Sequence, residues 1–60
     1  NVADTVNVMD SLGELYRDTD RPDLARTIWT QALDRLTAIA DTPAYAHFFN
    51  MVSGHLAELE

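Results

Sequence analysis

Three acidic side chains recur at four-residue intervals early in the chain, at Asp10, Glu14 and Asp18. Residues four apart share one face of a helix, so this spacing predicts a row of carboxylates. Like charges at that spacing destabilise a helix by about 0.2–0.5 kcal/mol per pair, although Arg17 lies beside Glu14 and offsets part of the repulsion. Two interpretations stay open: a face that is merely solvated, or a surface that recognises a basic or amine-bearing segment.

Other residues capable of chemistry lack the partners that catalysis needs. His47 and His55 are eight residues apart, whereas metal-binding pairs on a helix are spaced by three or four residues. We therefore expect both histidines to be exposed or partly buried rather than metal ligands. Ser11 and Ser53 lack the Gly-x-Ser-x-Gly context of a nucleophile elbow, and the chain has no cysteine. The sequence predicts a protein that is not an enzyme and that holds no metal or cofactor.

The charge balance narrows the class of partner. Ten acidic residues stand against four basic ones, all arginine, and the net charge is −6. Nucleic acids and anionic membrane surfaces attract basic faces, so we expect neither as a partner and favour a protein or peptide of basic character. No apolar run approaches the roughly 18 residues of a membrane span, and no signal peptide is present. We therefore expect a cytoplasmic protein.

Three amphipathic stretches, separated by two short breaks, predict an all-α fold. Within each stretch the apolar positions recur at spacings of three and four, the period of one helix face. The first holds Val6, Met9, Leu12, Gly13 and Tyr16, the second runs from Ala25 to Ala40, and the third runs from Tyr45 to Leu59. Because both breaks are short, we expect an antiparallel three-helix array.

Several residues suggest where these helices begin and end. Asp4 or Thr5 is expected to cap the first helix, and Thr42 to cap the third, where Pro43 suits the first helical position. Gly54 interrupts the third stretch, which predicts either a close contact or a fraying helix end.

Small and large residues alternate along the contact expected between the first two helices. Gly13 allows the backbones to approach closely, and Tyr16 fills the space one turn further on. Trp29 is then a wedge between two small residues, Ala25 and Ala32. Aromatic residues at helical spacing are expected in the core rather than in a ligand-binding box.

The adjacent Phe48 and Phe49 cannot both point inward equally. Of the two, Phe48 is expected to be the less tied to this contact, and one of the pair is expected to face a neighbouring repeat or a partner.

This order of residues resembles the tetratricopeptide repeat (TPR), a helix-turn-helix unit of about 34 residues. Met9 stands where the family usually has Trp, and Thr37 stands where a Pro usually closes the repeat. The resemblance covers residues 6–39 and implies a protein-binding module. The positions that match at the expected spacing are Met9, Leu12, Gly13, Tyr16, Ala25, Trp29 and Ala32.

The resemblance also implies which residues line the inner, peptide-holding surface. Some family members grip a C-terminal carboxylate there with Lys and Asn, but Asp10 and Glu14 carry the opposite charge, so we do not expect that clamp. Shape-based docking of a helical or extended peptide is expected instead. The implied inner-surface residues are Asn7, Asp10, Glu14, Arg17, Asp18, His47 and Asn50.

The whole chain, 1–60, is expected to form one module, with a repeat at 6–39 and a third helix at 43–60. It begins at Asn1 rather than Met, so we expect a piece of a longer protein. We favour a capping role for the third helix over the first half of a further repeat. Two alternatives to partner docking stay open: a terminal or capping segment of a larger helical-repeat regulator, and a small helical homodimerisation domain.

Overall fold

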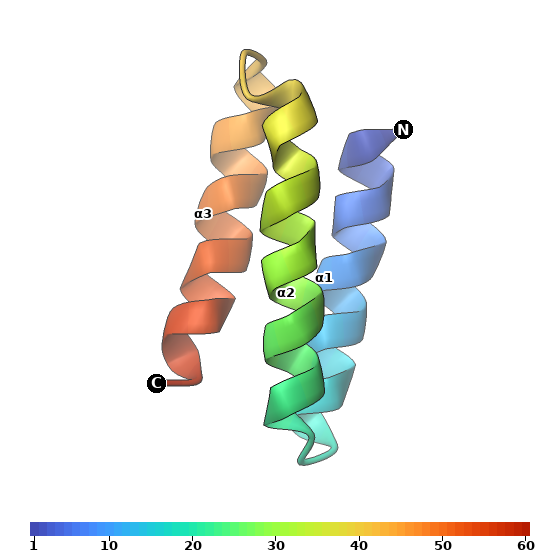
Figure 1. Ribbon diagram of the computed structural model, residues 1–60, viewed down its shortest axis with the longest axis vertical. Helices are drawn as coiled ribbons and strands as arrows, with labels where there is room; N and C mark the ends of the chain where they lie inside the picture. The colour runs from blue at the N-terminus through green and yellow to red at the C-terminus, as the bar shows by residue number, and fades with distance from the viewer.

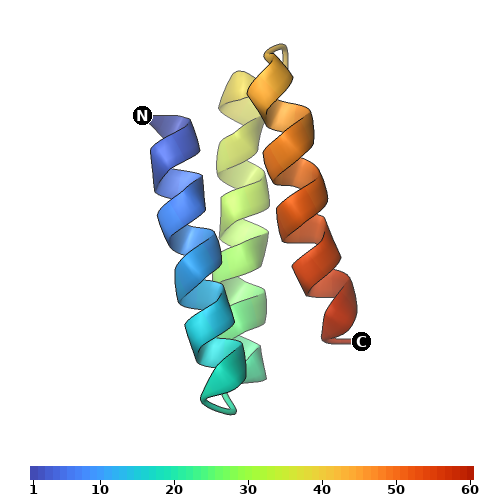
Figure 2. The same cartoon turned by 180° about the vertical axis from the view of Figure 1, so that it is seen from behind.

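The computed structural model describes all residues from Asn1 to Glu60. Helix α1 spans Val2–Asp18, α2 spans Pro22–Leu36, the short 3₁₀ turn η1 spans Thr37–Ile39, and α3 spans Pro43–Glu58. In both views α2 lies between α1 and α3 and runs antiparallel to them (Figure 1 and Figure 2). The predicted all-α three-helix array is confirmed, and none of the helices combines the length and apolar character that crossing a membrane requires.

The first helix begins earlier than the sequence analysis predicts. Asn1 is its N-cap, and the side-chain oxygen of Asn1 accepts a hydrogen bond from the backbone N–H of Asp4 at 2.8 Å. Asp4 and Thr5 therefore lie inside the helix and do not cap it. The carboxylate of Asp4 occupies the first turn, where the helix dipole favours negative charge.

The turn between α1 and α2 closes the first helix with a Schellman pattern of hydrogen bonds. The N–H of Arg21 donates to the carbonyl of Tyr16 at 2.8 Å, and the N–H of Asp20 donates to the carbonyl of Arg17 at 3.2 Å. Asp20 takes the left-handed conformation that this motif needs, with φ of 61°. Glycine is the usual residue there, but Asp tolerates it better than most side chains do. Pro22 then starts α2.

The second connection and the third helix differ in detail from the prediction. Thr42 occupies the N-cap position ahead of Pro43, but its hydroxyl donates backwards to the carbonyl of Ile39 at 2.8 Å and caps nothing. Gly54 neither interrupts α3 nor marks a close contact, because the helix continues to Glu58 and no atom lies within 4 Å of where its Cβ would be.

The core is built around α2. The fully buried apolar residues are Val6, Ala25, Trp29, Ala32, Leu36 and Val52. Phe48 packs against this core, whereas Phe49 is 39% exposed. The expectation that Phe48 is the less engaged of the pair was therefore wrong, because α3 turns position 48 towards the core and position 49 outward.

Gly13 is where the indole of Trp29 meets α1. A Cβ at position 13 would lie 2.7 Å from Cδ1 of Trp29 and nearer still to Nε1 and Cε2, so no side chain fits without displacing the ring. The sequence analysis predicts a close helix approach at Gly13, and the structure shows that the space is taken by the Trp29 ring.

We predict that Gly13→Ala lowers the free energy of unfolding by about 1–3 kcal/mol, because it overpacks the contact with Trp29. Gly54→Ala is the matched control: nothing crowds that position, and Ala is the better helix former by about 1 kcal/mol or less. Urea unfolding followed by circular dichroism measures both. Equal stabilities of Gly13→Ala and the parent protein would contradict the packing described here.

Candidate functional site

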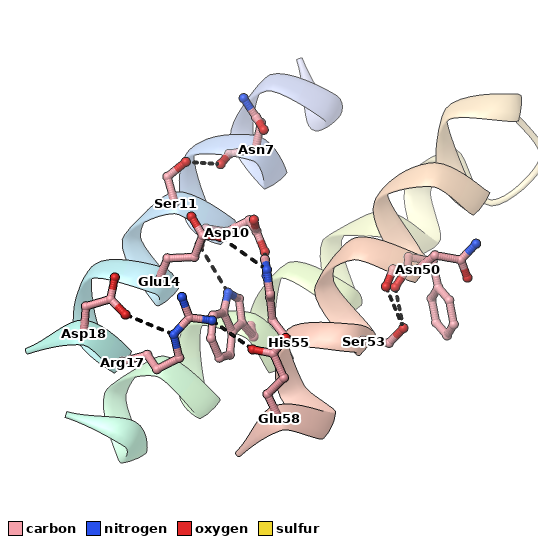
Figure 3. Close-up of polar contacts among 12 residues, drawn as sticks. Asn7, Asp10, Ser11, Glu14, Arg17, Asp18, Asn50, Ser53, His55 and Glu58 are labelled. Atoms are coloured by element: carbon pink, nitrogen blue, oxygen red, sulfur yellow. Dashed lines mark hydrogen bonds and ion pairs between the residues drawn. The ribbon is translucent and has the colours of Figure 1, made fainter. Parts of the chain in front are cut away.

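Polar side chains from α1 and α3 meet in one cluster (Figure 3), and two of them, those of His55 and Arg17, lie over the ring of Trp29. We call this group the α1–α3 polar cluster. Three of its members come from α1 and were predicted as inner-surface residues, whereas the two from α3 were not. Its members are Asp10, Glu14, Arg17, His55 and Glu58.

Asp10 is the buried anchor of this cluster. Its side chain is 7% exposed, and its Oδ1 lies 2.6 Å from Nδ1 of His55. Its backbone carbonyl accepts a hydrogen bond from Nε1 of Trp29 at 3.2 Å. Asp10 therefore does not present charge to solvent, and the exposed row expected at Asp10, Glu14 and Asp18 does not form, because α3 covers its first member.

His55 joins the two helices through both of its ring nitrogens. Nδ1 faces Asp10, and Nε2 lies 3.3 Å from Oε1 of Glu14. The ring also stacks on Trp29, with centroids 5.1 Å apart and planes tilted by 27°. A neutral imidazole donates from one nitrogen only, whereas the protonated ring donates from both. The imidazole therefore lies between two carboxylates of α1, one at each ring nitrogen.

Arg17 forms a second bridge from α1 to α3. Its Nη1 donates to Oε2 of Glu58 at 3.0 Å, and its Nε donates to Oδ1 of Asp18 at 3.2 Å. The hydrogen bond with Asp18, aided by the charges of Asp18, Glu58 and Glu14, raises the pKa of Arg17 despite the opposing effect of desolvation. The guanidinium also lies 5.9 Å from the centre of the Trp29 ring, within cation–π range.

The remaining predicted inner-surface residues lie outside this cluster. Asn7, His47 and Asn50 are exposed, and Asp18 is exposed although Arg17 pairs with it. The ring of His47 meets only the edge of Phe48, at 5.1 Å between centroids. The predicted inner-surface residues therefore fall into two groups. Some are paired with each other or with α3, and the others are exposed to solvent.

His55 and Glu58 were the residues that sequence reasoning missed. His55 is 45 residues from Asp10 in sequence, so helical spacing within one stretch cannot connect them. The one signal in the sequence was the row of carboxylates. Closely spaced carboxylates on a helix are stabilised by basic or polar groups from another helix, and the chain has only a few basic residues and histidines that could supply them.

The hydroxyl groups of the two serines are both engaged with backbone carbonyls of their own helices. The hydroxyl of Ser11 donates to the carbonyl of Asn7, and that of Ser53 donates to the carbonyl of Phe49. The α1–α3 polar cluster does bring three potential cation ligands together, because one donor atom each from Asp10, Glu14 and His55 lies within 4.8 Å of the others.

The hairpin of α1 and α2 carries an open hollow elsewhere on the molecule. It measures about 410 Å³ and lies between the start of α1 and the end of α2, where Thr5 and Arg35 are among its lining residues.

No protein-family model, curated protein or solved structure matches this chain. The resemblance to the TPR family therefore rests on the residue pattern alone and stays a prediction.

We predict that His55→Ala lowers the free energy of unfolding by about 1–3 kcal/mol, because it leaves the buried carboxylate of Asp10 without its partner. His47→Ala removes an exposed histidine from the same helix and should change stability by less than about 0.5 kcal/mol. Urea titrations of the two variants make the comparison. Equal effects would show that the contact between His55 and Asp10 contributes nothing specific.

Proposed function

We propose that this chain is a non-catalytic, TPR-like interaction module that docks an amphipathic helix of basic character along the α1–α2 hairpin. The observation that carries the proposal is a set of large apolar side chains left exposed on one side of the hairpin. Val8 is 67% exposed, Leu15 57% and Leu24 47%. Exposed apolar side chains that gather into one patch are typical of interaction sites.

On α1, the exposed apolar side chains lie on the side of the helix turned away from α3. At 100° per residue, Val8 and Leu12 lie about 160° around α1 from Asp10, which faces α3. Leu12 also lies two turns below Thr5, and Ile28 lies two turns from Arg35; Thr5 and Arg35 line the open hollow. We call these residues the apolar flank: Val8, Leu15 and Leu24 are exposed, and the half-buried Leu12 and Ile28 follow Val8 and Leu24 by one helical turn.

The negative charge of the chain favours a basic partner at the apolar flank. The net charge is −6, and Arg17 is already held by Asp18 and Glu58. Asp4, in the first turn of α1, and Asp34, in the last turn of α2, are exposed at one end of the hairpin. A helix with an apolar stripe and Arg or Lys at its margins would meet both the apolar side chains and the acidic surroundings, and the charges would raise its association rate.

The apolar flank supports docking better than the inner surface implied by the TPR resemblance. On that surface Asp10 is buried and Arg17 is paired within the chain, so neither is free for a partner. Asn7, His47 and Asn50 stay exposed there and offer polar contacts without apolar anchors.

We predict that the double substitution Val8→Gln, Leu15→Gln weakens binding of a synthetic helical peptide at least tenfold while leaving unfolding by urea nearly unchanged. The peptide carries leucines on one face and Lys and Arg along its margins. Phe49→Gln is the matched control, because it removes exposed apolar surface from α3. Fluorescence anisotropy of the labelled peptide, at low and at physiological salt, measures the affinities.

Three outcomes would overturn the proposal. A peptide with Glu in place of Lys and Arg that binds equally well would remove the role of charge. A concentration-dependent dimer in sedimentation, dissociated by the double substitution, would assign the apolar flank to a second copy of the chain. Binding lost equally in Phe49→Gln would show that the flank is not the docking surface.

A further inference from the structure

We propose that the α1–α3 polar cluster binds a divalent ion of the zinc type between His55 and Glu14. Nε2 of His55 and the carboxylate of Glu14 would be the protein ligands, water would complete the coordination shell, and Asp10 would hold the imidazole in place. The site lies opposite the apolar flank and is independent of the docking proposed there.

The first observation is that both ring nitrogens of His55 face carboxylates. The carboxylate of Asp10 is almost buried, and its Oδ1 lies 2.6 Å from Nδ1. On the other side of the ring, Nε2 faces Oε1 of Glu14 at 3.3 Å. An ion bound between Nε2 and this oxygen would therefore have one nitrogen and one carboxylate ligand, both of which zinc takes.

The distance between Nε2 of His55 and Oε1 of Glu14 also fits a zinc ion. Zinc bonds to histidine nitrogen and carboxylate oxygen are about 2.0–2.2 Å long. Two ligands of a tetrahedral ion with such bonds are about 3.3–3.5 Å apart. Nε2 of His55 and Oε1 of Glu14 are separated by 3.3 Å, so small adjustments of the flexible Glu14 side chain would admit the ion.

The third observation is the hydrogen bond on the far side of the ring. Metal-binding histidines generally donate their other N–H to a carboxylate or carbonyl, which fixes the tautomer and makes the ligand nitrogen more basic. Asp10 stands in that position. Trp29 stacks against His55 and Nε1 of Trp29 bonds the Asp10 carbonyl, so the ring that would bind the ion is oriented from two helices.

The surroundings also admit and favour a cation. The Glu14 side chain is 43% exposed and that of His55 18%, which leaves a path from solvent and room for water ligands. The carboxylate of Glu14 faces the site and that of Asp10 lies behind the ring, and the nearby Arg17 has its charge offset by Asp18 and Glu58. An imidazole ligand suits zinc, whereas Mg²⁺ and Ca²⁺ prefer sites made of oxygen alone.

The test is calorimetric titration of the protein with Zn²⁺ alone. We expect saturable binding of one ion, at least tenfold weaker in Glu14→Gln, which keeps the size of a half-exposed side chain. Asp10→Asn should weaken binding about 10–100-fold, as expected for a group that orients a ligand. His47→Ala is the control that should bind like the parent protein, and Mg²⁺ should give no saturable signal.

A second readout separates this site from adventitious binding. In ¹⁵N spectra of the histidine rings, Zn²⁺ should shift Nε2 of His55 and leave His47 unchanged. Unaltered Zn²⁺ affinity in Glu14→Gln, equal loss in His47→Ala, or no saturation at millimolar Zn²⁺ would each overturn the proposal. A circular dichroism spectrum of each variant checks that it is folded before its Zn²⁺ affinity is compared with that of the parent protein.

Discussion

The contact between the Trp29 ring and the backbone of α1 is the constraint on which the rest of the structure depends. The ring is fully buried and lies where a side chain at Gly13 would otherwise be. Its Nε1 finds a hydrogen-bond partner in the carbonyl of Asp10, which still has a second lone pair for the helix. Since a buried indole N–H without a partner would cost free energy, this position fixes both the depth of the ring and the separation of α1 from α2.

The same ring determines how α3 is attached. His55 stacks on one side of Trp29, and Arg17 approaches the ring from α1. The contact of α1 with α2 is mainly apolar, whereas that of α1 with α3 is made largely of charges: Asp10 and Glu14 with His55, and Arg17 with Glu58. Ion pairs at the surface are screened by salt and contribute little each, so α3 depends on the buried pair and on its apolar contacts.

The number, order and packing of the helices follow from the sequence because these are properties of apolar periodicity and of short breaks. The burial of Trp29 and the close helix approach at Gly13 also follow from the sequence, because both residues fall on the apolar faces of their helices. The left-handed conformation of Asp20 could not be predicted from the sequence, because glycine is the residue that usually indicates it. The pairing of Asp10 with His55 was beyond reach, since it depends on the register of α3 against α1, which no local pattern specifies.

That register also explains how the chain tolerates a row of carboxylates four residues apart. Asp10 and Glu14 face the imidazole of His55, and Asp18 faces the guanidinium of Arg17, so each carboxylate of the row has a polar partner. These contacts offset part of the repulsion that the row would have in an isolated helix. Only Asp10 is removed from solvent, whereas Glu14 and Asp18 keep 43% and 66% of their side chains exposed. The negative surface of the molecule is therefore shared between these two residues and the exposed acidic residues of the turns and helix ends, such as Asp4, Asp20 and Asp41.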